Sequence, residues 1–134
     1  MRAVLDPNVL ISALLSPAGA PAELLRAWRE GRFELLVSPQ VLAELHRALA
    51  YPKLRQRIAA DEAKEYLAWL EQNAERVADP SSPSSVRSHD PGDDYLLALA
   101  EQERAALVSG DDHLLALDAD APVFAPAAFL RVLG

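Results

Sequence analysis

The stretch MRAVLDPNVLISALL (residues 1–15) decides the fold class. A short apolar run ends abruptly on the carboxylate of Asp6, and hydrophobic residues resume at Val9. Residues 2–6 show no helical period and predict a buried strand, whereas residues 9–15 predict a helix. Asp6 is therefore either a surface residue at an ordinary turn or a carboxylate that has a function at the end of a buried strand.

The rest of the chain continues this alternation of short strands and helices. We expect further strands over residues 33–37, 75–78, 105–109 and 122–125, and helices over 21–30, 61–73, 93–103, 111–117 and 126–132. Another helix is predicted to begin at Pro39, with Ser38 as its N-cap, and to stop before Pro52. Residues 79–92 are rich in serine and proline and predict a loop. This order favours an α/β fold with a parallel sheet covered on both faces.

Composition limits the class of protein. The 134 residues suffice for one domain with a real core, and 51% of them are hydrophobic and 25% charged, as in globular proteins. No apolar run approaches the roughly 18–20 residues of a membrane span, and the first residues lack a signal-peptide pattern, so we expect a cytoplasmic protein with no membrane segment. The absence of cysteine excludes disulfides and thiolate metal sites.

Charge is unevenly distributed along the chain. The formal net charge of −7 argues against a nucleic-acid partner. Residues 24–60, however, hold seven basic residues against three acidic ones, so this segment carries +4 and the remainder −11. The basic residues are either ordinary solvated helix faces or a patch that faces phosphates, and the sequence leaves both interpretations open.

Four acidic residues fall at related positions of the expected fold. In open parallel α/β sheets, ligands bind beyond the carboxyl ends of the strands. Asp6 ends the first strand, and Asp111 follows a later strand by one glycine. Asp93 begins the buried helix that leads into that later strand, and Glu44 lies at the border of the apolar face of its helix. We therefore expect all four carboxylates at one edge of the sheet.

A cluster of this kind favours a divalent cation. Carboxylates that lie close together repel and raise one another's pKa, and a hard cation such as Mg²⁺ or Mn²⁺ relieves that cost. The three histidines lack a zinc-like spacing. Taken singly, each acid has a structural alternative: Asp93 or Asp94 at a helix N-terminus, Asp111 as an N-cap, Glu44 as a solvated helix residue.

Motifs in the order found here resemble those of PIN-domain proteins, specifically the single-domain bacterial kind classed as toxins of toxin–antitoxin pairs. The resemblance is carried by VLDPNVLISALLS (4–16), LLVSPQVLAEL (35–45), HDPGDDYLLALA (89–100) and ALVSGDDHLL (106–115), with VFAPAAFLRVL (123–133) as a closing strand and helix. These stretches span essentially the whole chain. No single motif is very specific for this family, but the set of motifs in this order and at this spacing is.

Carried over residue by residue, the resemblance implies a set of site residues. The acids that would act as catalytic residues and metal ligands, and the polar residues that would support them, are Asp6, Glu44, Asp93 and Asp111, with Asn8 and Ser109. Asp94 and Asp112 double two of these positions, so the ligand in each pair stays open, although the family spacing favours Asp93. Pro7 and Ser109 stand where threonine is commoner, and neither departure removes an acid.

The resemblance also implies an architecture and an activity. It predicts one PIN-like domain over residues 1–134, a three-layer α/β/α fold with a short, mostly parallel central sheet. It further implies a Mg²⁺- or Mn²⁺-dependent endoribonuclease, a cognate antitoxin and a homodimer. Candidate RNA contacts in the basic segment are Lys53, Arg55 and Arg57. The alternatives are an RNA-processing nuclease without a toxin role and a non-catalytic RNA-binding or regulatory module.

Two other enzyme classes place aspartates on similar sheets. Phosphotransferases of the haloacid dehalogenase kind require an Asp-x-Asp motif, and here the second position is Asn8. Response-regulator receivers require adjacent acids after the first strand and a lysine after a late strand, and neither is present. The sequence therefore favours the nuclease interpretation.

Overall fold

Five short parallel strands form the centre of the fold. In the computed structural model, which describes residues 1–88 and 91–134, their order across the sheet is β3-β2-β1-β4-β5. Their bounds are β1 (Arg2–Leu5), β2 (Glu34–Val37), β3 (Glu75–Arg76), β4 (Ala106–Val108) and β5 (Val123–Phe124). Each neighbouring pair in this order is parallel, so all five carboxyl ends meet at the same edge.

Eight α-helices and one 3₁₀ turn lie between or after the strands in the part of the chain that the structure describes. They are α1 (Pro7–Leu15), α2 (Ala20–Arg29), α3 (Pro39–Leu49), α4 (Pro52–Arg55), α5 (Ala60–Asn73), η1 (Pro91–Asp93), α6 (Asp94–Glu103), α7 (Asp112–Leu115) and α8 (Pro126–Leu133). Among the described helices, none is singly long and apolar enough to cross a membrane, while α1 and α2 meet that test of length and composition only as a pair bent by 99°.

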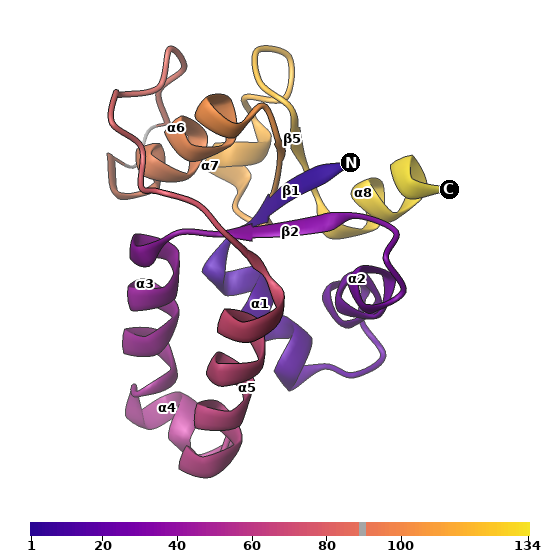
Figure 1. The fold of residues 1–134 in the computed structure, drawn as a ribbon, viewed down its shortest axis with the longest axis vertical. Helices are drawn as coiled ribbons and strands as arrows, with labels where there is room; N and C mark the ends of the chain where they lie inside the picture. The colour runs from indigo at the N-terminus through magenta and orange to yellow at the C-terminus, as the bar shows by residue number, and fades with distance from the viewer. Residues whose placement is uncertain (89–90) are drawn as a thin grey trace.

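The two faces of the sheet bury different cores, which makes the fold three-layered. Side chains alternate along β1, so that Ala3 and Leu5 pack into one core and Val4 into the other. The first core is completed by α1, α2, α3, α5 and α8, and the second mainly by α6 and α7. Figure 1 shows α1, α3 and α5 below the sheet and α6 and α7 above it. The α/β fold and the three layers are as predicted.

Several elements differ from their expected bounds by one or two residues, as in β3, which ends at Arg76 and not at Ala78, and one helix is additional. Helix α1 begins at Pro7, two residues earlier than predicted, because Asp6 caps it and proline suits the first helical position. The four-residue helix α4 was not predicted, since Pro52 and three following residues are too short to show a periodic pattern. Residues 89–90, which belong to the predicted loop and open the third motif, lie outside the described residues.

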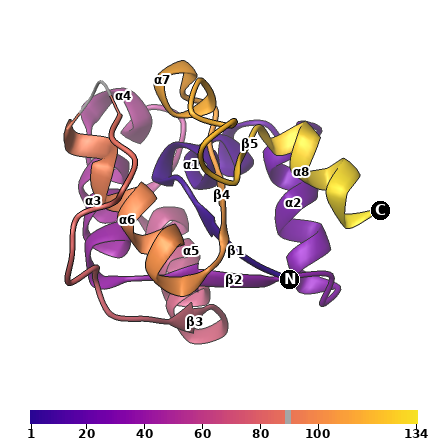
Figure 2. The ribbon, with the colours of Figure 1, turned by 90° about the horizontal axis from the view of Figure 1, so that it is seen from above.

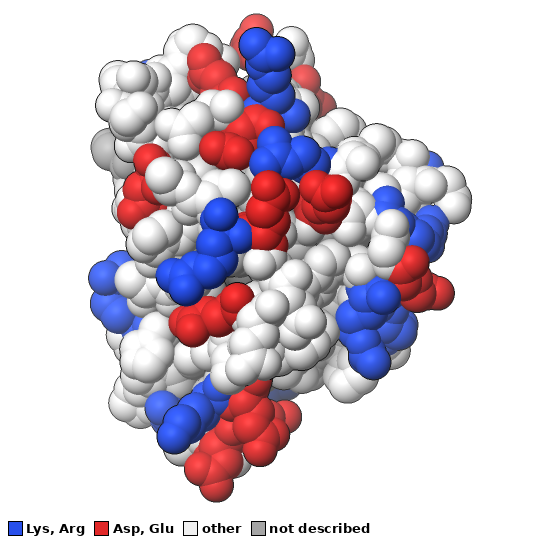
Figure 3. Space-filling model, in the orientation of Figure 1, with Lys and Arg blue, Asp and Glu red and all other residues white. Residues whose placement is uncertain are grey.

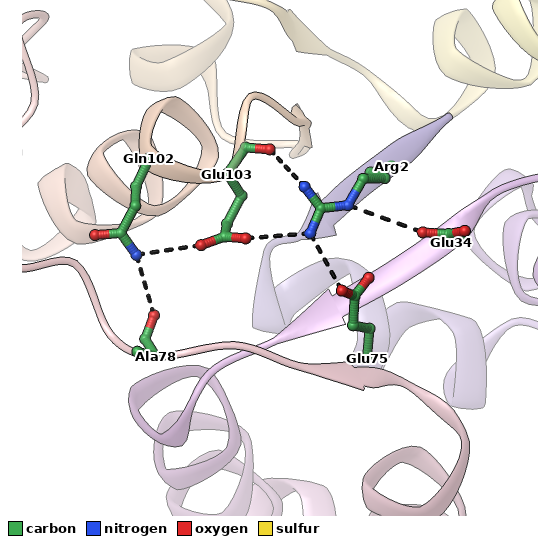
Figure 4. A network of polar contacts seen from close by, with 6 residues as sticks. All are labelled: Arg2, Glu34, Glu75, Ala78, Gln102 and Glu103. Carbon is green, nitrogen blue, oxygen red and sulfur yellow. Dashed lines mark hydrogen bonds and ion pairs between the residues drawn. The ribbon is translucent and has the colours of Figure 1, made fainter.

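An ion-pair network fastens the amino end of the sheet, opposite Asp6. The guanidinium of Arg2, the first residue of β1, pairs with Glu34 at 3.8 Å, Glu75 at 3.3 Å and Glu103 at 3.1 Å. It also donates a hydrogen bond of 2.7 Å to the backbone carbonyl of Glu103. Figure 4 shows Arg2 at the centre of these contacts, which join β1, β2, β3 and the end of α6. The network holds the strands in place from the end that carries no candidate site residue.

Candidate active site

Asp6 is fixed at the junction of β1 and α1. Its backbone N–H donates to the carbonyl of Val108 at 2.9 Å, which continues the pairing of β1 with β4 by one residue. Its side chain caps α1: Oδ1 accepts from the backbone N–H of Asn8 at 3.0 Å. Only 4% of Asp6 is exposed to solvent. The carboxylate is therefore a buried group at the carboxyl end of the central strand.

Ser109 connects Asp6 to the end of the neighbouring strand. This fully buried residue directly follows β4, and its hydroxyl donates to Oδ2 of Asp6 at 2.8 Å. The same Oγ accepts from the backbone N–H of Asp111 at 3.0 Å. Both oxygens of the Asp6 carboxylate thus accept a hydrogen bond. The hydroxyl of Ser109 contacts one residue that follows β1, Asp6, and one that follows β4, Asp111.

Asp111 begins the short helix α7. Its Oδ1 accepts from the backbone N–H of His113 at 2.8 Å, the geometry of an N-cap, and the residue is half-buried. The structural alternative considered for Asp111, an N-cap, is therefore present. Asp111 also lies close enough to Asp6 for the two carboxylates to repel each other.

Glu44 reaches the site from α3 and is held there by Tyr95. Helix α3 begins at the N-cap Ser38, whose Oγ accepts from the backbone N–H of Val41 at 3.3 Å. Glu44 follows on its second turn and is half-buried. The hydroxyl of Tyr95, in the first turn of α6, donates a hydrogen bond to Oε2 of Glu44. This contact joins a helix of one layer to a helix of the opposite layer at the carboxyl edge of the sheet (Figure 1).

The pKa of Asp6 is raised above its ordinary value, chiefly because burial disfavours the charged form. The hydrogen bonds from the Asn8 N–H and the Ser109 hydroxyl oppose this rise in pKa. Repulsion by Glu44 and Asp111 adds to it. These two carboxylates therefore lie near enough to Asp6 to act on its ionisation.

The electrostatics of Tyr95 place the fourth acid in the same group. Its pKa is raised first by burial and then by the hydrogen bond to Glu44. The negative charges of Glu44, Asp6 and Asp93 raise it further. Asp93 therefore acts on the same hydroxyl as Asp6 and Glu44.

Comparison with known families identifies the family of this chain. Residues 2–113 match the sequence profile described as the PIN domain. The chain belongs to the PIN-domain family. PIN domains are generally nucleases.

Three relatives place this PIN domain among known proteins. It is 26% identical over 117 residues to the uncharacterized protein MJ1680 of Methanocaldococcus jannaschii, a match that covers 87% of this chain and 75% of that protein. The crystal structure of PAE2754 from Pyrobaculum aerophilum superposes with a TM-score of 0.66 and 18% identity, covering 98% of this chain and 89% of that one. VapBC2 from Rickettsia felis, solved bound to a DNA fragment from their promoter, gives a TM-score of 0.62 and 15% identity over 93% of this chain and 97% of that one. At these identities, the two solved structures share the fold.

The two members of the Asp93–Asp94 pair face different surroundings in this PIN domain. Asp94 turns to the preceding loop, where Oδ1 accepts from the backbone N–H of Ser88 at 2.7 Å and Oδ2 pairs with Arg87 at 3.6 Å. Asp93 ends η1, and its Oδ2 is shielded from solvent. Asp93 also acts on the pKa of Tyr95, whereas Asp94 turns away from that residue toward Ser88 and Arg87.

The donor set suits a hard divalent cation by its chemistry. Asp6 is buried and repelled by Glu44 and Asp111, and carboxylate oxygens are the ligands that Mg²⁺ prefers. Over residues 1–88 and 91–134, no three Asp, Glu or His side chains stand in an arrangement that could by itself hold a metal ion. Mg²⁺ is usually bound through one or two carboxylates and retains several waters, so its binding does not require three direct protein ligands.

The supporting polar residues contribute through different atoms. Ser109 reaches Asp6 with its side chain, whereas Asn8 reaches it with its backbone N–H and has an exposed side chain. Asp112 is exposed in the first turn of α7. The sequence did not predict a role for Tyr95 in the site, because its partner Glu44 is 51 positions away. The one signal was an aromatic residue with a hydroxyl at the start of an otherwise apolar helix.

The basic segment divides between two surfaces. Lys53, Arg55 and Arg57 are exposed on and just after α4, beyond the end of α3. Arg26, Arg29 and Arg32 instead line a separate hollow of about 720 Å³ beside α8. Figures 1 and 2 place α4 and α2 on different sides of the molecule. On the face viewed in Figure 3, basic and acidic side chains are interspersed.

Proposed function

We propose that this PIN domain is a Mg²⁺- or Mn²⁺-dependent endoribonuclease that acts as the toxin of a toxin–antitoxin pair in the cytoplasm. The observation that carries the proposal is the buried carboxylate of Asp6, repelled by Glu44 and Asp111 at the carboxyl edge of the sheet. A buried carboxylate that is repelled by neighbouring acids is costly to maintain, and perturbed carboxylates of this kind concentrate at functional sites.

The residues that would hold the cation are Asp6, Glu44, Asp93 and Asp111. When bound, a divalent cation polarises the scissile phosphate and lowers the pKa of an attacking water. Asp6 would be kept in a fixed orientation by the hydrogen bonds that both of its oxygens accept. Any carboxylate of the group that faces the attacking water would accept its proton.

The choice of RNA and of a toxin role rests on the motifs and on the shared fold. The four motifs resemble those of the single-domain toxins, and VapBC2 from Rickettsia felis has the same fold. That likeness supports a cognate antitoxin as partner, and the resemblance supports a homodimer. Lys53, Arg55 and Arg57 are exposed and positively charged, as contacts with RNA phosphates require.

The activity is tested with purified protein and a single-stranded RNA that contains a loop. We expect cleavage in Mg²⁺ or Mn²⁺, its loss in excess EDTA and its return when the cation is restored. Asp6→Asn keeps the shape of the side chain but removes its charge, and it should abolish cleavage. Undiminished cleavage in EDTA would refute the metal mechanism, and no cleavage of any RNA by the native protein with cation would favour a binding module.

A matched control removes a carboxylate by the same substitution outside the group. Asp118 is exposed beyond the end of α7. Asp118→Asn should therefore cleave RNA at the native rate. An equal loss of activity in Asp118→Asn and Asp6→Asn would show that the assay reports a general loss of negative charge instead of a site.

A further inference from the structure

The contact between Tyr95 and Glu44 assigns a function to a residue outside the acidic set. We propose that Tyr95 is a positioning residue, which holds the Glu44 carboxylate in the conformation that binds the divalent cation. The inference rests on the proposed function. It goes beyond it because Tyr95 is neither an acid nor one of the polar residues expected to support the acids.

Glu44 needs such a partner more than Asp6 and Asp111 do. Asp6 has a short side chain that is pinned by two hydrogen bonds, and Asp111 is pinned by the cap of α7. Glu44 has a longer, half-buried side chain that comes from the second turn of α3. A free glutamate side chain loses considerable rotamer entropy when it is ordered, so a preformed contact lowers the cost of binding a cation.

Tyr95 is suited to this role by its rigidity and its surroundings. A tyrosine has two side-chain dihedrals before its hydroxyl, and the ring of Tyr95 packs against the core formed by α6 and α7. A tyrosine hydroxyl ordinarily ionises only at about pH 10, so this hydroxyl is a hydrogen-bond donor at neutral pH. The donor is thus fixed by packing on one layer while the acceptor comes from the other.

Hydrogen bonds of this kind orient the side chains that bind metals and thereby raise metal affinity. Carboxylates that bind metals are themselves hydrogen-bonded, and loss of such an outer partner typically weakens metal affinity about 10- to 100-fold. Tyr95→Phe removes the hydroxyl and keeps the packed ring. We therefore expect Tyr95→Phe to bind Mn²⁺ about 10- to 100-fold more weakly.

The experiment measures Mn²⁺ affinity by electron paramagnetic resonance of the free ion, in the native protein and in Tyr95→Phe. A second readout needs no metal: NMR three-bond couplings report whether the Glu44 side chain keeps one rotamer. We expect one rotamer in the native protein and averaging in Tyr95→Phe. The matched control is Tyr66→Phe, which removes another buried hydroxyl, one that donates to the Leu10 carbonyl at 2.7 Å. It should leave Mn²⁺ affinity unchanged.

The double variant with Glu44→Ala shows whether Tyr95 acts through Glu44. Because the acceptor of its hydrogen bond is then absent, Tyr95→Phe should cause no further loss of Mn²⁺ affinity in that background. A further loss as large as in the native background would overturn the positioning role. Native affinity in Tyr95→Phe, or an unchanged Glu44 rotamer, would overturn it while leaving the proposed function intact. Failure of the native protein to bind Mn²⁺ would overturn both.

Discussion

The hydroxyl of Ser109 lies 2.8 Å from Oδ2 of Asp6, although the two residues are 103 positions apart in the chain. The pairing of β1 with β4 brings them together, since Asp6 and Ser109 each directly follow one of these strands. The oxygen of the same hydroxyl accepts a hydrogen bond from the backbone N–H of Asp111. One buried side chain therefore sets the positions of two of the four acids.

Removal of this hydroxyl should affect both stability and activity. In Ser109→Ala, a buried carboxylate oxygen is left without its donor and a backbone N–H without its acceptor, and each such change costs about 1–3 kcal/mol. We expect a lower free energy of unfolding in urea titrations and at least a tenfold lower rate of RNA cleavage.

Ser84 offers the control for this variant. Its hydroxyl is also buried and also donates to a carboxylate, Oε2 of Glu101, at 3.0 Å, but it lies in the loop before α6. Ser84→Ala should leave the cleavage rate unchanged. Native activity in Ser109→Ala would mean that the orientation of Asp6 does not matter for the reaction.

The raised pKa of Asp6 predicts a dependence of stability on pH in metal-free solution. Below its ordinary value of 3.8, the carboxyl is protonated in both the folded and unfolded states and carries no penalty. As the pH rises through the window between that value and the raised pKa, the unfolded chain releases its proton first, so the folded state loses stability. Asp6→Asn cannot ionise and escapes this loss.

The measurement is urea unfolding of the native protein and Asp6→Asn at a series of pH values in EDTA. We expect the native protein to lose stability relative to Asp6→Asn as the pH rises above about 4. A difference that stays constant with pH, or that changes in favour of the native protein, would contradict a raised pKa at Asp6.

The exposed residues of α4 and its end predict salt-dependent RNA binding. In an inactive Asp6→Asn background, replacement of Lys53, Arg55 and Arg57 by Ala should weaken binding. It should also reduce the slope of log affinity against log salt by about 0.7 for each phosphate that the variant no longer neutralises. RNA affinity is measured by fluorescence anisotropy over a range of salt concentrations.

The other basic surface supplies a control of equal charge. Arg26, Arg29 and Arg32 lie beside α8, on a different side of the molecule (Figure 2). Their replacement by Ala should leave the salt slope closer to that of the parent. If both triple variants change the slope equally, the effect is one of net charge, and if neither does, RNA contacts other residues.

Strands β1 and β2 could be predicted because most of their residues are buried on both faces. Runs such as Ala3–Leu5 and Leu35–Val37 are apolar throughout, which is typical of a parallel sheet between two helical layers. The start of α1 could not be predicted to the residue. Its beginning depends on the cap that Asp6 provides, and an Asp before a Pro is also compatible with a turn.

The candidate site was predictable where topology alone determines it. Asp6 and Asp111 follow strands, so their common edge follows from a parallel sheet. Asp93 and Asp94 are adjacent, and only the hydrogen bond from Ser88 and the ion pair with Arg87 show which carboxylate turns away. Contacts between distant helices, such as the one that joins Tyr95 to Glu44, leave no trace in local sequence patterns.

The central claim is that the four acids form one divalent-cation site, and the thermal midpoint of unfolding as a function of Mn²⁺ concentration tests it most directly. A cation that binds only the folded state stabilises it by about 2.7 kcal/mol at 100 times its dissociation constant. We predict that the midpoint of the native protein rises by several degrees with Mn²⁺, whereas that of the Asp6→Asn/Asp111→Asn variant does not. A flat curve for the native protein, or an equal rise in the double variant, would contradict the claim.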